Sequence, residues 1–312
     1  MIDFDEQAVI VTGAGRGLGR LYAMEFARRG ARVVVNDLGG SVEGSGADRS
    51  VADQVVEEIQ GEGGVAVASY DSVDTPEGGN AIVARSLDHF GRIDAVVSNA
   101  GIFRTPSFED LSPAEWRQML RVHLDGAFHV SQPAFRAMKA QGYGRFVFIA
   151  SSAGLFGQPN SAHYAAAKAG TVGLANVIAI EGEPHGILAN TVLPFGYSRM
   201  VTSTLGAEDA AALREASGFM RAIEPELVVP MVVFLASRTC QVTHHNYSAC
   251  AGRFARVFVG LGSGWVADSG SRPSADDIAA HLSDVSATEP FIVPTSIFDE
   301  VANTCERLGI TA

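Results

Sequence analysis

Short apolar runs alternate with longer stretches of helical periodicity through the first two-thirds of the chain. The apolar runs are nearly continuous in Val, Ile and Phe, which is typical of strands buried on both faces of a parallel sheet. They lie at Ala8–Thr12, Arg32–Asn36, Val65–Ser69, Ile93–Val97, Arg145–Ala150 and Ile187–Leu193, and a further run is expected at Arg256–Gly260. The pattern therefore predicts a parallel sheet of about seven strands.

Helical periodicity fills the intervals between the apolar runs. The expected helices lie near residues 17–30, 49–61, 76–90, 112–140, 163–182 and 224–236. Strands separated by helices form βαβ units, which place helices on both faces of a parallel sheet. The predicted fold class is α/β: a Rossmann-like, doubly wound parallel sheet with a short C-terminal extension.

Two Gly- and Ser-rich stretches interrupt this alternation. One, Gly39–Ala47, follows the second apolar run, and the other, Gly260–Pro273, follows the last. We expect the sheet domain to span residues 1–265 and the extension to span 266–312. Because the extension is too short for a core of its own, it is expected to pack on the main domain or on a neighbouring subunit.

A Gly-rich turn connects the first strand to the first helix. It reads Thr12-Gly13-Ala14-Gly15-Arg16-Gly17-Leu18-Gly19. Glycines allow a tight turn and a close approach of the backbone to a pyrophosphate, and the helix N-terminus adds N–H groups and partial positive charge. A tight turn without any ligand is the alternative interpretation of this stretch taken alone.

An acidic residue ends the second strand. Asp37 lies eighteen residues beyond Gly19. A carboxylate in this place accepts hydrogen bonds from the adenosine ribose hydroxyls and repels a 2′-phosphate. The turn and Asp37 together predict dinucleotide binding, with NAD favoured over NADP. Arg16 is a basic residue in the turn that would weaken this preference by meeting a phosphate.

Tyr164 and Lys168 are four residues apart in an expected helix. This spacing places both side chains on one face, about 5–6 Å apart at Cβ. An ammonium group near a phenol stabilises the phenolate, which lowers the tyrosine pKa toward the range of a general acid/base. Lys168 and Lys139 are the only lysines of the chain, so an accidental pairing is a poor explanation.

Taken together, these motifs resemble the short-chain dehydrogenase/reductase family over residues 6–265. Further motifs carry the resemblance: an aspartate after the third strand (Asp71), Ser98-Asn99-Ala100-Gly101 after the fourth, with Ser98 replacing a family asparagine, and Ser151 thirteen residues before Tyr164. The resemblance implies cofactor contacts at Gly13, Arg16, Gly17, Leu18, Gly19, Asp37, Asp71, Ser72, Asn99, Ala100, Gly101, Tyr164, Lys168 and Pro194.

The resemblance also implies catalytic roles. Tyr164 exchanges a proton with the substrate hydroxyl, Lys168 lowers the tyrosine pKa and reaches the nicotinamide ribose, and Ser151 holds the substrate oxygen. The family's fourth catalytic position, usually an asparagine, is occupied by His123. Whether His123 takes part in a proton relay or is a packing residue stays open at this point.

A narrower resemblance concerns the dehydrogenase domain of the peroxisomal multifunctional enzymes type 2. It is carried by Asn36–Gly40, Arg121–Gly126, Ser198–Met200 and Gly262–Trp265. It implies an NAD-dependent 3-hydroxyacyl-CoA dehydrogenase with some 17β-hydroxysteroid activity. The alternatives are a steroid or terpenoid alcohol dehydrogenase, a 3-oxoacyl-thioester reductase that uses NADPH, and a non-catalytic NAD-sensing protein.

Aromatic and aliphatic residues cluster in the loops after the fourth, fifth and sixth strands. An apolar wall there suits an acyl chain or a steroid, although each residue also fits an ordinary core. Two arginines in the same loops are candidates for CoA phosphates or a carboxylate, with a solvated surface charge as the alternative. The substrate candidates are Phe103, Arg104, Phe156, Phe195, Tyr197 and Arg199.

Composition narrows the remaining possibilities. The net charge of −12 and the pI near 5.1 argue against nucleic acid and acidic membrane surfaces as partners. The sequence contains no apparent signal peptide or membrane span, and Cys240, Cys250 and Cys305 are odd in number, so a cytoplasmic location is expected. The spacing of His244 and His245 with two of the cysteines matches no common zinc pattern, and no metal is expected. The family resemblance implies a homodimer or homotetramer.

Overall fold

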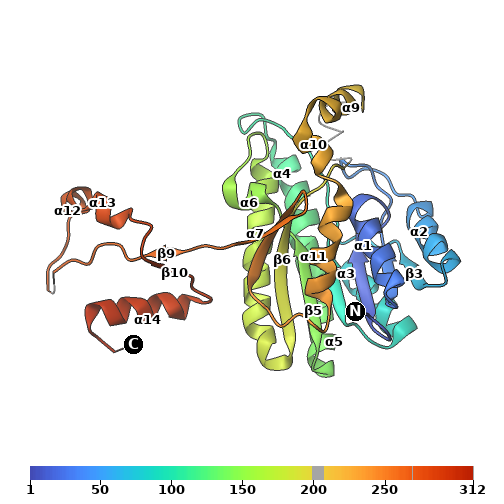
Figure 1. The fold of residues 1–312 in the computed structure, drawn as a ribbon, viewed down its shortest axis with the longest axis horizontal. Helices are drawn as coiled ribbons and strands as arrows, with labels where there is room; N and C mark the ends of the chain where they lie inside the picture. Colours follow the sequence, from blue (N-terminus) through green and yellow to red (C-terminus); the bar gives the residue numbers. More distant parts are fainter. Residues whose placement is uncertain (199–206, 269, 312) are drawn as a thin grey trace. The chain divides into compact units, whose positions relative to one another are not determined.

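Figure 1 shows the computed structural model, which describes residues 1–198, 207–268 and 270–311. The central sheet has eight strands in the order β3-β2-β1-β4-β5-β6-β7-β8. Their bounds are β1 Ala8–Thr12, β2 Arg32–Asn36, β3 Val65–Ser69, β4 Ala95–Ser98, β5 Gly144–Ile149, β6 Ile187–Phe195, β7 His245–Cys250 and β8 Arg253–Val257. All pairings from β3 to β7 are parallel. The predicted doubly wound fold is confirmed.

Helices cover both faces of this sheet (Figure 1). One face packs against α1 Gly17–Arg28, α2 Ser50–Gly61 and α11 Val229–Ala236. The other packs against α3 Pro76–Phe90, α5 Gly126–Gln141 and α7 Ala162–Gly182. In β1, Val9 and Val11 face the first core and Ile10 faces the second. Both faces of the strand are therefore buried, which explains its uninterrupted apolar run.

The seventh strand differs from the prediction. It lies at His245–Cys250 and pairs in parallel with β6, not at Arg256–Gly260. After it, Ala251 and Gly252 have φ of 51° and 77°, as in a type I′ hairpin turn, and β8 follows. The sequence His-Asn-Tyr-Ser-Ala-Cys mixes polar and apolar residues, so it lacks the continuous apolar signal of the inner strands.

The long helix expected at 112–140 is interrupted. It consists of α4 Pro113–Leu120, a π-helical turn η1 Arg121–Asp125, and α5. Ser112 caps α4 in a reciprocal capping box with Glu115. The other short helices of this part are α6 Ser152–Phe156, η2 Glu183–His185, α9 Ala207–Ala216, α10 Gly218–Ala222 and η3 Pro225–Val228.

The chain divides into two compact units, Met1–Arg256 and Val257–Ala312. The second unit contains β9 Leu261–Gly262, α12 Ala275–Ala280, α13 Leu282–Val285, β10 Phe291–Ile292 and α14 Ile297–Leu308. Trp265 stacks on His281 within it, with ring centroids 4.3 Å apart. The function of the extension and its boundary at 265 stay predictions. Within the described ranges, no helix is long and apolar enough to cross a membrane.

Candidate active site

The Gly-rich turn approaches neighbouring backbone so closely that side chains are excluded. Gly13 has φ of +64°, and a Cβ there would lie 2.7 Å from Ala100 Cα. A Cβ on Gly19 would lie 2.0 Å from the Gly13 carbonyl oxygen. Since α1 begins at Gly17, its first N–H groups lie at the sheet edge where an anion can bind.

The Asp37 carboxylate binds two glycine-rich segments, the turn before α1 and the segment after β2. Its Oδ2 accepts a hydrogen bond from Gly15 N at 2.8 Å, and its Oδ1 accepts one from Gly39 N at 2.7 Å. A carboxylate has about four lone-pair positions, so it can also accept hydrogen bonds from ribose hydroxyls. The residue that favours NAD in the sequence analysis thus also holds the backbone of its own site.

Thr12 and Asn99 join the ends of β1 and β4. Thr12 Oγ1 accepts hydrogen bonds from Asn99 N at 3.0 Å and Ala100 N at 3.1 Å. Asn99 Nδ2 donates to the carbonyl oxygens of Thr12 at 3.0 Å and Gly13 at 3.1 Å. These bonds fix the Gly-rich turn against the strand-end motif, so two segments far apart in sequence form one surface.

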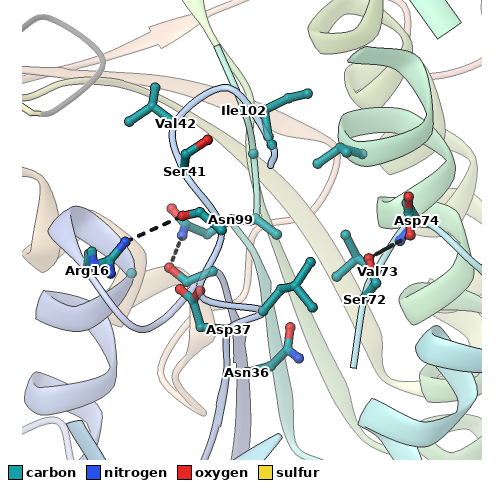
Figure 2. A pocket seen from close by; sticks show the side chains of 18 of the residues that line it. Arg16, Asn36, Asp37, Ser41, Val42, Ser72, Val73, Asp74, Asn99 and Ile102 are labelled. Carbon is teal, nitrogen blue, oxygen red and sulfur yellow. Dashed lines mark hydrogen bonds between the residues drawn. The ribbon is translucent and has the colours of Figure 1, made fainter. Parts of the chain in front are cut away.

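A cavity of about 270 Å³ lies at this edge of the sheet. Figure 2 shows Arg16 on one side of it and Ser72, Val73 and Asp74 on the other, with Asp37 between them. The predicted cofactor residues that line it are Gly13, Arg16, Gly17, Leu18, Gly19, Asp37, Asp71, Ser72, Asn99, Ala100 and Gly101. The cavity, the crowded glycines and the helix N-terminus fit the nucleotide half of a dinucleotide.

Several lining residues were not predicted as cofactor contacts. They are Asn36, Leu38, Gly40, Ser41, Val42, Gly44, Val73, Asp74, Ile102, Gln118, Arg121, Val122 and Ser198. Part of this set belongs to the Gly- and Ser-rich stretch after β2, whose composition marked it as a loop but not as a lining segment. Its glycines and serines were the available signal.

Three of the four predicted catalytic residues come from two neighbouring elements. Ser151 caps α6 directly after β5, and its Oγ accepts a hydrogen bond from Ala153 N at 3.2 Å. Tyr164 and Lys168 are both buried on α7. The Lys168 Nζ lies 5.7 Å from the centre of the Tyr164 ring and donates to the Ile149 carbonyl oxygen at 2.5 Å.

Burial governs the pKa values of this pair. It lowers the pKa of Lys168 to about 7, from an ordinary 10.5. It also raises the pKa of Tyr164, against which a hydrogen bond with Ser151 acts. The direction at Tyr164 is opposite to the one expected from the sequence, because removal of the phenolate from water outweighs the hydrogen bond with Ser151.

His123 lies against the tyrosine. The rings of His123 and Tyr164 meet edge to face, with centroids 5.2 Å apart. His123 Nε2 is 2.7 Å from the Ile102 carbonyl oxygen and 3.1 Å from Ile102 N, so its tautomer decides which bond forms. Burial and the charge of Lys168 hold its pKa well below 6.5. Its Nδ1 is buried without a hydrogen-bond partner among the described residues.

His163, which the sequence analysis did not select, is fully buried beside Tyr164. Both of its ring nitrogens lack a partner in the part of the chain that the structure describes. Burial lowers its pKa, and the charges of Glu115 and Arg104 act on it in opposite directions. Its position directly before Tyr164 was the only signal in the sequence.

The predicted substrate residues have different neighbours in the structure. Phe103 packs edge to face on Tyr164 with centroids 5.1 Å apart, whereas Phe195 contacts Phe219 at 6.1 Å. The other three described candidates are placed as follows: Tyr197 lies under the Arg214 guanidinium, Phe156 is 67% exposed, and Arg104 lies near the carboxylates of Glu43 and Glu115. Arg199 lies outside the described residues, and Pro194 is partly buried in β6.

The fold and this site define a nicotinamide-dependent oxidoreductase, and comparison with known proteins identifies the family. A model of the short chain dehydrogenase family matches residues 7–209. The chain belongs to the short-chain dehydrogenase family, whose members act on CH–OH groups.

The chain is similar to known proteins from mouse and from Mycobacterium tuberculosis. It is 47% identical over 249 residues to mouse peroxisomal multifunctional enzyme type 2, and this alignment covers 80% of this chain and 32% of that enzyme. It is 41% identical over 280 residues to a putative short-chain type dehydrogenase/reductase of Mycobacterium tuberculosis, covering 90% of this chain and 94% of the relative. The chain thus spans about a third of the mouse enzyme.

Solved structures resemble it as well. Full-length peroxisomal multifunctional enzyme type 2 from Drosophila melanogaster superimposes with a TM-score of 0.79 at 30% identity, covering 99% of this chain and 50% of that one. A 7α-hydroxysteroid dehydrogenase complexed with NADH and 7-oxo glycochenodeoxycholic acid gives a TM-score of 0.71 at 26% identity, covering 80% of this chain and 95% of that one.

Proposed function

We propose that this protein is an NAD(H)-dependent dehydrogenase that interconverts a secondary alcohol and a ketone on a 3-hydroxyacyl-CoA or a similar hydrophobic substrate. The observation that carries the proposal is the pairing of buried Tyr164 and Lys168 on α7 next to Ser151 at the end of β5. The preference for NAD is supported by Asp37, which directly follows β2 and lines the nucleotide cavity.

Each catalytic side chain has a distinct task. Tyr164 Oη removes the proton from the substrate hydroxyl during oxidation and returns it during reduction. Ser151 Oγ binds the same substrate oxygen and keeps it aimed at the phenol. A bound nicotinamide cofactor accepts or supplies the hydride. The Lys168 ammonium group donates a hydrogen bond to the Ile149 carbonyl oxygen, and in this protonated form the lysine stabilises the Tyr164 phenolate.

The substrate class is supported by the names of relatives and by apolar residues near the tyrosine. One relative is named 3-oxoacyl-[acyl-carrier-protein] reductase, at 34% identity over 231 residues. Phe103 and Ile102 pack in the same apolar cluster as Tyr164. A hydroxysteroid is the second candidate, favoured by the similarity to the hydroxysteroid dehydrogenase. The cytoplasmic location and the homodimer or homotetramer stay predictions.

Steady-state assays of the purified protein test this proposal. NAD⁺ and NADP⁺ are each combined with 3-hydroxyacyl-CoAs, hydroxysteroids and simple secondary alcohols. We expect turnover of the acyl-CoAs with NAD⁺ and a kcat/KM at least about tenfold lower with NADP⁺, the equivalent of 1.4 kcal/mol. If only steroids are turned over, the proposed substrate class is wrong and a hydroxysteroid takes its place. If NAD binds but no compound is turned over, the proposed catalytic function is wrong.

A further inference from the structure

The Gly- and Ser-rich segment Leu38–Asp48, here called the roof loop, covers part of the nucleotide cavity. Gly40, Ser41, Val42 and Gly44 line the cavity, and Ser41 and Val42 are visible above Asp37 in Figure 2. The loop is closed at its base by a hydrogen bond from Asp48 N to the Leu38 carbonyl at 3.0 Å. It is therefore a compact loop with its own internal order.

The roof loop rests on the segment that follows β4. Phe103 N donates to the Val42 carbonyl at 2.9 Å, and Arg104 Nη2 donates to the Glu43 carbonyl at 3.4 Å. The carboxylate of Glu43 adds an ion pair with Arg104 at 3.8 Å. A Cβ on Gly44 would lie 2.9 Å from Ile102 Cγ2, so the two segments are in close contact.

Phe103 connects this contact to the catalytic tyrosine. Its backbone holds the roof loop, while its ring meets the Tyr164 ring at 5.1 Å and 88°. His123 packs on the same tyrosine at 90°, so Tyr164 has two edge-to-face neighbours. Such ring pairs contribute beyond their buried area and restrict rotation of the phenol. Phe103 is not among the described residues that line the nucleotide cavity.

We propose that Phe103 is a positioning residue for Tyr164. The roof loop, through Val42 and Glu43, couples the position of the Phe103 ring to the binding of a nucleotide in the cavity. A bound nucleotide fills the space beneath the loop. If the loop moves when the nucleotide binds, its contacts with residues 102–104 move the Phe103 ring as well. This inference rests on the proposed function, because it needs NAD(H) as the ligand and turnover as a signal.

The test is a double-mutant cycle with Phe103→Leu and Glu43→Gln. Neither side chain lines the cavity. We expect Phe103→Leu to lower kcat at saturating substrates about two- to tenfold and to shift the apparent pKa of the kcat/KM profile. We also expect it to weaken NADH binding, measured by fluorescence. Glu43→Gln shifts the same pKa in the same direction, and the double variant changes less than the product of the two single effects.

Matched controls use the same connection between β4 and α4. Phe108→Leu and Glu109→Gln replace exposed residues of the same types and leave all three quantities unchanged. Independent effects in the cycle, or an altered KM for substrate alone in Phe103→Leu, would overturn the proposal and leave Phe103 as an ordinary wall of the substrate site. An inactive wild-type protein would instead contradict the proposed function.

Discussion

The nucleotide end of the site depends on backbone segments that approach one another closely, whereas the catalytic end depends on buried side chains. At the first end there is no room for a Cβ on Gly13 or Gly19, nor on the two glycines, Gly15 and Gly39, whose backbone N–H groups donate to Asp37. At the second, Tyr164 and Lys168 are shielded by neighbouring rings and helices. The first end is therefore sensitive to added atoms, and the second to removed functional groups.

Removal of the phenol hydroxyl gives the largest expected effect. Tyr164→Phe keeps the ring contacts with Phe103 and His123 but loses the group that exchanges the proton. We expect kcat to fall about 10²- to 10⁴-fold, with the Kd for NADH unchanged by fluorescence titration. Unchanged turnover would show that another residue handles the proton.

Added atoms at the nucleotide end should act on binding and stability together. In Gly19→Ala the new Cβ meets the Gly13 carbonyl at 2.0 Å and the Asn99 amide at 2.6 Å. We expect loss of NADH binding and a decrease of about 1–3 kcal/mol in the free energy of unfolding, measured in urea. The control is Gly61→Ala on α2, where a Cβ has open space. Equal behaviour of the two variants would contradict the close approach.

Asp37 tests whether the nucleotide end needs side chains at all. Asp37→Ser removes the acceptors for Gly15 N and Gly39 N, and we expect KM for NAD to rise about 10- to 100-fold. The preference for NAD over NADP should fall with it. Asp88→Ser, at an exposed position of α3, is the control. A variant that keeps its KM for NAD would assign Asp37 no part in binding.

A pH dependence of the free energy of unfolding is expected at the catalytic end. The pKa of Lys168 is about 7 in the folded protein and near 10.5 when exposed. Between these values the unfolded chain holds a proton that the folded one lacks. The free energy of unfolding therefore rises with pH from about 7 upward, by at most about 1.4 kcal/mol per pH unit from this group.

Urea unfolding of the wild type and Lys168→Met at pH 7, 8 and 9 measures this contribution. The difference in unfolding free energy between them should change with pH in favour of the wild type. A constant difference would show that the folded lysine keeps an ordinary pKa. The catalytic end would then be less isolated from water than its burial indicates.

Local patterns were sufficient where each residue's surroundings repeat along the chain. The bounds of β1 and β2 agree with their apolar runs because both faces of each strand are buried in a core. The bounds of β3 agree as well, although Val65 is exposed and Val67 is only partly buried at this edge of the sheet. At β7 the same criterion failed, because half of its residues are polar and interrupt any apolar run. The Gly-rich turn and the Tyr164–Lys168 pair were predicted from fixed spacings, which depend only on the local backbone.

Contacts between distant segments could not be predicted in this way. The place of Phe103 on Tyr164 depends on how the connection after β4 folds back over α7. Burial of Lys168 and Tyr164 depends on the whole packed domain, so the direction of the Tyr164 pKa could not be deduced from a spacing of four residues. The roof loop's position at the cavity depends on contacts with residues 102–104, which are distant in the sequence.

The π-helical turn Arg121–Asp125 limits how this protein can vary in length. A π-helical turn contains an extra residue relative to an α-helix, and this one places Arg121 at the nucleotide cavity and His123 against Tyr164. Because the wider turn accommodates the extra residue locally, deletion of one residue here would restore α-helical hydrogen bonding and leave the orientation of α5 unchanged, at the cost of the placement of Arg121 and His123. Within α5 itself, a one-residue insertion or deletion would rotate the rest of the helix by about 100° and displace its core-facing side.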